Sequence, residues 1–312
     1  MWGGARTALA AWCAARKAGG RFTLRMEDLD AARVVPGMAE ALLRDLAWMG
    51  LEWDSGPDRG GSRGPYKQSR RQGLYVVALD GLYRQGRLFP CNRSRKELRM
   101  LASAPHGTST PYPRHLRPAY VVPHWYERRA AAIRFRVPDG VVRFDDLVCG
   151  TQAQDVAREV GDFVLRRKDG VFAYQLAVVV DDLHMGITDV VRGQDLLHST
   201  ARQLLLVDAL GGIPPRYAHV PLIVTAQGEK LSKRDTVCTV ATIRARGVEP
   251  DVLVGYLAWS FGLVPECIPM KPIELLATFS WSRIRRREPW TLAADFPAEL
   301  SRTVTLHACT AS

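Results

Sequence analysis

The stretch Val220-Pro221-Leu222-Ile223-Val224, followed by Gly228-Glu229-Lys230-Leu231-Ser232-Lys233-Arg234-Asp235, decides how the rest of the chain is interpreted. The apolar run predicts a strand, and the basic segment predicts the loop at its end. In an open α/β sheet, ligands bind outside the carboxyl ends of the strands. Lysines beside a glycine suit a loop that closes over a polyphosphate, because each ammonium is a mobile point charge. Short basic segments are also common on solvated surfaces, so the neighbouring sequence has to decide.

The composition is that of a globular protein with a basic surface. The 312 residues include 47% apolar and 24% charged side chains, and the net charge of +11 favours a polyanionic partner such as RNA, although a basic protein need not bind one. No apolar run approaches the roughly 20 residues of a membrane span, and we find no signal-peptide pattern. We therefore expect a cytoplasmic protein with no membrane partner. The cysteines are scattered without a CxxC pair, which argues against a disulfide framework and a ready metal site.

The first 88 residues alternate between helical and extended patterns. Helices are predicted over 5–18, 37–49 and 67–85, each followed by glycine, and Leu74, Val77 and Leu82 are expected on the buried side of the third. A strand is predicted over 21–26, ending at carboxylates that include Glu27. This order of elements is half of a doubly wound α/β fold.

The middle of the chain reads as an insertion, after which the α/β pattern resumes. Prolines and short alternating pieces over 89–157 predict a small domain with strands at 132–137 and 141–144. A strand is predicted over 162–167, the apolar run 171–180 predicts the most buried strand, and Ser199 and Thr200 are plausible caps of a helix that runs to Gly211. The predicted fold is therefore a doubly wound core of residues 1–88 and 158–240, the insertion 89–157, and a helical region 241–312.

Three motifs, in this order along the chain, resemble those of one enzyme family. Leu24-Arg25-Met26-Glu27-Asp28-Leu29-Asp30 is similar to the LRIEDLD stretch of glutamyl-tRNA synthetases. Phe172 to Asp182, followed by Gly186-Ile187-Thr188 and Arg192-Gly193-Gln194-Asp195-Leu196-Leu197, matches the same group. Lys230-Leu231-Ser232-Lys233-Arg234 resembles the KMSKS signature of class I aminoacyl-tRNA synthetases. The resemblance covers about residues 3 to 290 and implies a Rossmann-like class I core.

The short tail selects a group within that family. Only residues 235–312 follow the basic loop, whereas a full glutamyl-tRNA synthetase carries a longer helical anticodon-binding domain. The chain therefore resembles the short paralogues, the glutamyl-Q tRNA(Asp) synthetases, including over 282–289. This resemblance implies that ATP, with Mg²⁺, activates L-glutamate, which is then esterified to queuosine in the anticodon of tRNA(Asp). We expect the protein to act as a monomer.

The resemblance also implies roles for residues of the ATP site. Adenylation requires that the transition state be positioned and its negative charge neutralised. Lys233 matches the lysine that contacts ATP, Lys230 supports it, and Leu231, Ser232 and Arg234 complete the loop. Gly3 belongs to the remainder of a HIGH-type motif and is expected beside ATP.

The glutamate pocket is expected to need one carboxylate and at least one guanidinium. By resemblance, Glu27 receives the substrate ammonium, Arg192 binds a carboxylate through its bidentate fork, and Tyr174 donates a hydrogen bond. Each residue also has a structural alternative. Glu27 could belong to an acidic surface turn, Arg192 could pair with Asp182 or Asp195, and Tyr174 could be a half-buried strand residue.

The chain departs from the family pattern at its zinc ligands. Many members hold zinc with a Cys-x-Cys, a tyrosine and a later cysteine. Cys91 and Tyr112 match, but Arg93 and Leu116 replace the other two ligands. Zinc takes about four N, S or O ligands, and only His106 and His115 lie nearby to replace the lost thiolates. We therefore expect no zinc.

A second departure concerns the start of the sequence. The resemblance places Met1 where the first histidine of the HIGH-type motif stands, after a strand that would be central in the sheet. An unpaired central position would expose apolar surface and backbone groups. We expect residues 1–312 to be poorly stable or inactive, and normal ATP–pyrophosphate exchange would contradict this. An in-frame upstream segment ending in histidine would instead indicate a misplaced start codon.

Two other functions compete with the main hypothesis. One is a truncated glutamyl-tRNA synthetase that charges a tRNA 3′ end, and the other is a non-catalytic RNA- or nucleotide-binding remnant. For either RNA partner, four basic segments are candidates for phosphate neutralisation. These are Arg59 to Arg63, Arg93 to Lys96, Arg128-Arg129 and Arg285-Arg286-Arg287.

Overall fold

The computed structural model describes residues 2–94, 97–98, 111–118, 131–225, 228, 239–284 and 289–291. The N-terminal part contains the helices α1 (Trp2–Lys17), α2 (Met38–Trp48) and α3 (Gln72–Arg84). Short 3-10 turns lie between and after the main elements, at Ala31–Arg33, Gln68–Arg70, Arg114–Leu116 and Gln194–Leu196. No helix of this described part is long and apolar enough to cross a membrane.

The central sheet has the strand order β4-β3-β7-β6. Its members are β3 (Val142–Asp146), β4 (Gly150–Gln154), β6 (Asp189–Gly193) and β7 (Arg216–Val220). β3, β7 and β6 are parallel, and β4 forms an antiparallel hairpin with β3. The carboxyl ends of the parallel strands therefore lie at one edge, which is where such sheets bind ligands.

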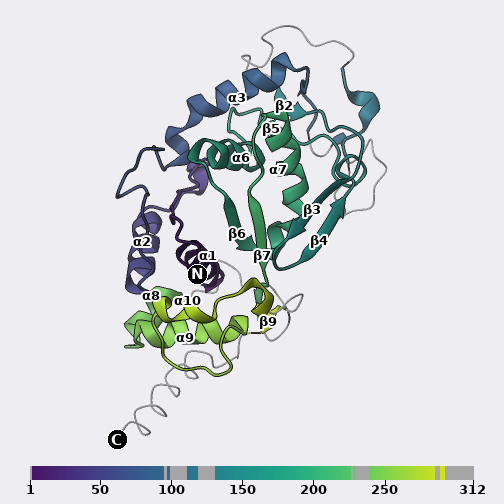
Figure 1. Ribbon diagram of the computed structural model, residues 1–312. Helices are drawn as coiled ribbons and strands as arrows, with labels where there is room; N and C mark the ends of the chain where they lie inside the picture. Colours follow the sequence, from purple (N-terminus) through teal and green to yellow (C-terminus); the bar gives the residue numbers. More distant parts are fainter. Residues whose placement is uncertain are drawn as a thin grey trace, which may run out of the picture.

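Helices from both halves of the chain cover the central sheet, so two hydrophobic cores form. The helices α6 (Tyr174–Met185) and α7 (Leu197–Ala209) join α3 in one core, against which Val142 and Phe144 of β3 pack. Helix α1 joins Ala218 and Val220 of β7 in the other. Figure 1 shows α6 and α7 beside the upper part of the sheet and α1 beside its lower part. This arrangement confirms the predicted α/β class I core.

A smaller antiparallel sheet joins β1 (Leu88–Cys91), β2 (Ala132–Phe135) and β5 (Val164–Arg166). The short helix α5 (Val156–Glu159) lies between β4 and β5 in the sequence. The strand pairing crosses the proposed domain boundaries twice. β3 and β4, inside the predicted insertion, join the central sheet, whereas β5, beyond it, joins the small sheet. The division into 1–88 with 158–240, 89–157 and 241–312 remains a proposal.

The C-terminal region is mainly helical over its described residues 239–284, as predicted from the sequence. It contains α8 (Val240–Ala245), α9 (Pro250–Phe261) and α10 (Leu275–Thr278), with 3-10 turns at Pro272–Glu274 and Trp281–Arg283. A strand pair of β8 (Ile223–Val224) and β9 (Trp290–Thr291) ties it to the core. Gly255 has no space for a side chain, since a Cβ there would lie 1.8 Å from the Ile268 carbonyl oxygen.

One buried arginine joins the first helix to the end of β7 and to the C-terminal region. Arg6, on α1, donates from Nη1 to the Pro221 carbonyl at 2.7 Å and from Nε to Ser260 Oγ at 3.0 Å. Its guanidinium also lies 4.0 Å from the ring centre of Phe261. Arg6 therefore ties α1 to the end of β7 and to α9.

The three predicted N-terminal helices are confirmed, but one of their buried positions is wrong. Val77 is 70% exposed on α3, whereas Leu82 is fully buried. The predicted strand over 21–26 is only partly formed, because the structure gives this segment isolated bridges such as Thr23 with Ser55. The predicted strand over 220–224 is likewise split by Pro221 between β7 and β8.

The most buried predicted strand, 171–180, is wrong because that segment forms the helix α6. A continuous apolar run does not distinguish a buried strand from a helix that is covered on every side. Residues 176–181 of α6 are all buried, and Gly186 ends the helix with a left-handed φ of 67°. The predicted caps Ser199 and Thr200 are also wrong, because α7 begins at Leu197 and both side chains lie buried within it.

Candidate functional site

A cavity of about 1290 Å³ runs along the free edge of β6, opposite the edge that pairs with β7. The segment Gly20 to Arg25 and the alanine face of α1 form much of its wall. Glu27, Tyr174 and Arg192 all line it, although they lie up to 165 positions apart in sequence. The structure thus brings the three predicted glutamate-binding residues together.

Arg192 lies on β6 and is 9% exposed. Its Nε donates to His219 Nε2 at 2.9 Å, its Nη1 to Gln203 Oε1 at 2.7 Å, and its Nη2 to Thr200 Oγ1 at 2.8 Å. Each of these nitrogens therefore donates to an acceptor without a full negative charge. A guanidinium carries five N–H groups, so one N–H on each Nη remains for the Tyr174 hydroxyl, which interacts with Arg192, and for a carboxylate in the cavity.

Glu27 lies in the cavity wall beside a second arginine. Arg25 donates to Glu27 Oε1 at 3.3 Å and to Asp182 Oδ1 at 2.6 Å. The Glu27 side chain lines the cavity and is 42% exposed. The loss of bulk solvent raises the pKa of Glu27, and Arg25 opposes that rise. A substrate ammonium would supply the additional positive charge that this carboxylate lacks.

Tyr174 is the first residue of α6 rather than the end of a strand. Burial raises the pKa of its hydroxyl, and the negative charge of Glu27 adds to the rise while Arg192 opposes it. Tyr174 therefore keeps its proton at neutral pH and is able to donate a hydrogen bond within the cavity.

The predicted ATP-binding residues are not tested by the structure. Lys230, Leu231, Ser232, Lys233 and Arg234 lie outside the described residues. Gly3 is exposed in the first turn of α1, and a Cβ there would meet nothing within 4 Å. The roles assigned to these residues stay predictions.

A buried ionic network around Asp181 lies next to the arginine that lines the cavity. Sequence patterns alone did not reveal this network. Asp181, on α6, accepts from Arg71 Nε, from Gln68 Nε2 at 2.8 Å and from the Tyr75 hydroxyl at 3.0 Å. Both members of the Arg71–Asp181 pair are fully buried. Arg25 Nε also lies 3.6 Å from Asp181, so the network reaches the arginine that contacts Glu27. The only signal in the sequence was the acidic pair Asp181-Asp182.

The residues that match the family zinc site do not fit a metal ion. Cys91 and Tyr112 pack with Phe89 in a small apolar cluster, and Leu116, in place of the last cysteine, packs against it. The guanidinium of Arg134 lies 4.6 Å from the ring centre of Tyr112. Among the described residues, no three His, Cys, Asp or Glu side chains are grouped to hold a metal. Apolar packing and a cation therefore occupy the position where the family places zinc.

We expect this region to gain zinc when its lost ligands are returned. The purified protein should contain well under one zinc per chain, and the double substitution Arg93→Cys with Leu116→Cys should raise this towards one, since zinc takes about four ligands. Metal analysis by mass spectrometry measures both. The matched control is Arg93→Ser with Leu116→Ser, and a stoichiometric metal in the unsubstituted protein would contradict the expectation.

Comparisons with known proteins agree with this geometry. The family "tRNA synthetases class I (E and Q), catalytic domain" matches residues 2–270. The chain is 48% identical over 305 residues to the glutamyl-Q tRNA(Asp) synthetase of Symbiobacterium thermophilum, covering 96% of this chain and 94% of that protein. It is 47% identical over 305 residues to the protein of the same name from Nitratidesulfovibrio vulgaris, with the same coverage.

Solved structures of longer synthetases have the same fold. The glutamate-tRNA synthetase of Elizabethkingia anophelis superposes with a TM-score of 0.82 at 26% identity, over 97% of this chain and 67% of that one. The glutamate tRNA ligase of Elizabethkingia meningosepticum, in complex with its amino acid, gives 0.83 at 27% identity, over 98% and 67% of the two chains.

Proposed function

The chain belongs to the class I tRNA synthetases of the E and Q type, within the group of glutamyl-Q tRNA(Asp) synthetases, and we propose that it activates L-glutamate with ATP and transfers it to queuosine in tRNA(Asp). The observation that carries the proposal is the convergence of Glu27, Tyr174 and Arg192 on one cavity at the edge of the central sheet. These side chains match an ammonium, a polar atom and a carboxylate, which are the groups of an amino acid with an acidic side chain.

The first step joins glutamate to the nucleotide. An oxygen of the glutamate α-carboxylate attacks the α-phosphorus of ATP, the bond to the β-phosphate oxygen breaks, and pyrophosphate leaves. Arg192 and Glu27 hold the amino acid by its charges, so their contribution is to fix the attacking oxygen in place. Mg²⁺ and the lysines Lys230 and Lys233 would neutralise the charge on the phosphates.

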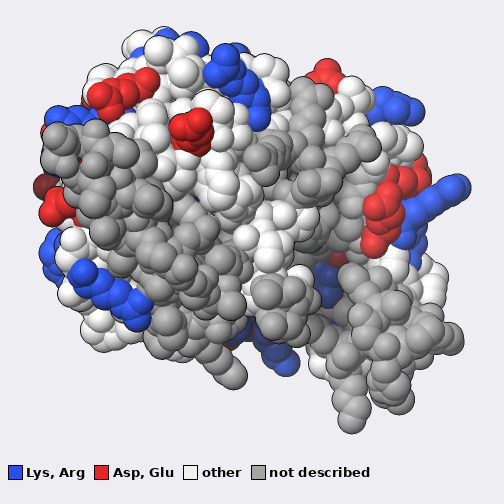
Figure 2. All heavy atoms as spheres, turned by 90° about the horizontal axis from the view of Figure 1, so that it is seen from below, with Lys and Arg blue, Asp and Glu red and all other residues white. Residues whose placement is uncertain are grey.

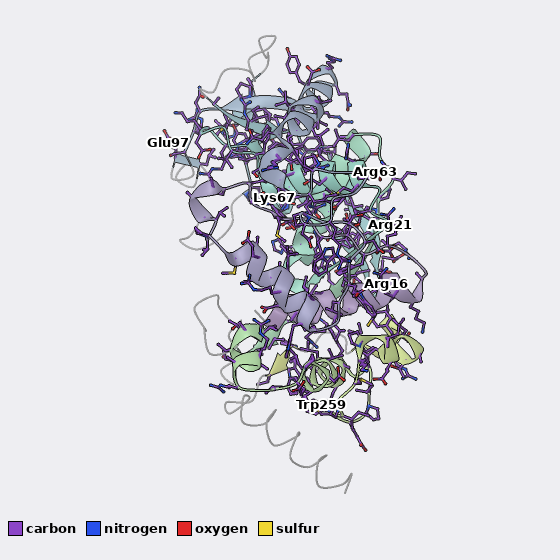
Figure 3. All side chains as sticks on the ribbon, turned by 90° about the vertical axis from the view of Figure 1, so that its left-hand side faces the viewer. Arg16, Arg21, Arg63, Lys67, Glu97 and Trp259 are labelled. Carbon is purple, nitrogen blue, oxygen red and sulfur yellow. The ribbon has the colours of Figure 1, made fainter. Side chains whose placement is uncertain are left out.

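The second step transfers the glutamyl group to RNA. A queuosine hydroxyl attacks the activated carbonyl, an ester bond forms, and AMP leaves with the bonding electron pair. The RNA would approach the side of the molecule that carries Arg63, Arg21 and Arg16, which follow one another along one edge in Figure 3. Arg63 also lines the cavity and donates to the His184 carbonyl at 3.0 Å. Of the other basic candidates, Arg93 is exposed, while Arg95, Lys96, Arg128, Arg129 and Arg285 to Arg287 lie outside the described residues.

The basic side chains do not continue as a uniform patch over the face seen in Figure 2. Its described residues carry both acidic and basic side chains, so the positive charge is not uniform there. Among the remaining candidates, Arg59 is held against the ring of Trp53, with 4.7 Å between the guanidinium carbon and the ring centre. We therefore place the main RNA contact on the edge with Arg63. We also propose that the protein acts as a monomer in the cytoplasm, where its tRNA substrate is found.

The test is transfer of radiolabelled glutamate to tRNA(Asp) that contains or lacks queuosine, with tRNA(Glu) as the control. Any label transferred is expected only on queuosine-containing tRNA(Asp), and any ATP–pyrophosphate exchange with glutamate, at the reduced level expected of residues 1–312, should not require tRNA. Label on tRNA(Glu) alone would instead support 3′-end charging. Binding of nucleotide and RNA without exchange or transfer would support the non-catalytic alternative.

A further inference from the structure

A buried chain of three side chains crosses the central sheet at the carboxyl ends of its strands. Asp146 ends β3, His219 lies on β7, and Arg192 lies opposite His219 on β6. His219 Nδ1 lies 2.6 Å from Asp146 Oδ2, and Arg192 Nε donates to His219 Nε2 at 2.9 Å. All three residues are buried, so water does not replace these hydrogen bonds.

Only one arrangement of protons satisfies this chain. Arginine Nε carries a hydrogen and has no acceptor capacity, so His219 Nε2 has to be the unprotonated acceptor. The ring proton therefore sits on Nδ1 and is donated to Asp146, which selects the tautomer. Asp146 is itself fixed by the backbone N–H groups of Val148 at 3.0 Å and Cys149 at 2.7 Å.

The charges around the pair agree with this arrangement. Burial alone would raise the pKa of Asp146, but hydrogen bonds from the His219 side chain and from the Cys149 and His219 amides outweigh it and leave the pKa lowered. Burial lowers the pKa of His219, Arg192 lowers it further, and the carboxylates of Asp146 and Asp195 oppose the shift. The Tyr217 ring stacks on His219, with 6.1 Å between ring centres. His219 is thus neutral at physiological pH.

We propose that Asp146 and His219 are positioning residues that hold the guanidinium of Arg192 in the plane required to bind the substrate carboxylate. The inference rests on the proposed function for the identity of that substrate. Thr200 and Gln203, both on α7, accept hydrogen bonds from Nη2 and Nη1 of Arg192. The Asp146–His219 pair fixes the third nitrogen, Nε, and so completes the orientation of the guanidinium plane. Neither Asp146 nor His219 lines the cavity, so both act through Arg192.

Two substitutions of the histidine separate positioning from packing. In His219→Gln, the side-chain oxygen takes the place of Nε2 and still accepts from Arg192. In His219→Asn, the amide nitrogen takes the place of Nδ1 and still donates to Asp146, but the acceptor for Arg192 is gone. We expect the dissociation constant of glutamate to change by less than about threefold in His219→Gln and to rise by about tenfold or more in His219→Asn, the usual size of one lost buried hydrogen bond to a charged group.

A substitution of the aspartate changes the tautomer without removing a side chain. In Asp146→Asn, the oxygen still accepts from the amides of Val148 and Cys149, while the NH₂ group faces His219 Nδ1. The ring proton then moves to Nε2, where it opposes the Nε–H of Arg192. We again expect glutamate binding to weaken by about tenfold or more. Calorimetry measures the binding, and thermal unfolding records any loss of stability separately.

Nitrogen NMR of the imidazoles tests the arrangement without any substrate. The His219 signal, assigned by its loss in His219→Gln, should show the Nδ1–H tautomer in the unsubstituted protein and the Nε2–H tautomer in Asp146→Asn. The Nε–H of Arg192 should be protected from exchange in the first protein and exchange faster in the second. An Nε2–H or doubly protonated His219 at pH 7 would overturn the inference, as would equal glutamate affinities in the two His219 variants.

The pH dependence gives a further readout. Because the pKa of His219 is lowered, glutamate affinity should stay constant from pH 8 to about the usual imidazole pKa of 6.5 and fall below it as Nε2 becomes protonated. This fall should be reduced in His219→Gln. Any part that remains is assigned to the cavity carboxylates Glu27 and Asp182, because burial raises the pKa of both. If the unsubstituted protein binds no glutamate, the proposed function fails, and the NMR experiment still decides whether the pair holds Arg192.

Discussion

Replacing Arg192 by lysine is expected to reduce the affinity for glutamate by at least about a hundredfold, while the affinity for ATP changes little. Lysine carries the same charge, but its ammonium does not present the planar fork that binds both oxygens of a carboxylate. The substitution also leaves His219, Thr200 and Gln203 without their buried donor. The two hydrogen bonds of the fork to a carboxylate are each worth about 1.5–3 kcal/mol, so their loss corresponds to about two to four powers of ten in the binding constant.

Calorimetry with glutamate and glutamate-dependent ATP–pyrophosphate exchange both measure this loss. The matched control is Arg158→Lys, since Arg158 is exposed and forms only a surface pair with Asp155. Tyr174→Phe provides a second variant in case Arg192→Lys disturbs folding, because it removes one hydroxyl from the cavity and leaves the ring in place. Unchanged glutamate affinity in both Arg192→Lys and Tyr174→Phe would refute the assignment of the cavity.

Replacing Asp181 by asparagine is expected to lower the free energy of unfolding by about 3–5 kcal/mol, the usual effect of removing one partner of a buried ion pair. The substitution keeps the size of the side chain but leaves the fully buried guanidinium of Arg71 without its carboxylate. Burial raises the pKa of the Tyr75 hydroxyl, and Asp181 raises it further, so this hydroxyl keeps its proton and donates to Asp181. The substitution therefore also removes the charged acceptor of Tyr75.

Urea unfolding measures this effect as a change in midpoint at a constant dependence on denaturant. Asp139→Asn is the matched control, because the Asp139 side chain is 84% exposed in its pair with Arg114 and such pairs contribute little. A loss below about 1 kcal/mol in Asp181→Asn, no larger than an exposed pair is worth, would show that the network does not hold α3 against α6.

The structure brings Glu27, Tyr174 and Arg192 to one cavity, but the element that carries Tyr174 differs from the predicted one. Arg192 lies near the end of an extended segment and Glu27 directly after one. Both positions also belong to motifs that resemble those of the family. Tyr174 was assigned to a strand rather than to the helix α6, because the apolar residues 171–180 have no polar face to reveal the helical period. A short run of sequence does not show how much of its surface segments far away in the chain will bury.

The support of the cavity was harder to predict for a different reason. His219 and Asp146 are 73 positions apart, and Arg71 and Asp181 are 110 apart. The residues next to His219 and Arg71 in the sequence do not show whether these side chains are buried or exposed to solvent. Only the order of the parallel strands, β3 beside β7 beside β6, places Asp146, His219 and Arg192 in one line.

The long reach of Arg6 has a consequence for the time course of synthesis. Its contact with Ser260 spans 254 positions, and a ribosome adds about 5–20 residues per second, so α1 is made on the order of ten seconds to a minute before its partner exists. β7 is made only near the end of that interval, and α9 is absent throughout it, so the apolar side of α1 lacks these partners for most of the time. The core that contains α1 is therefore completed only after α9 has been made.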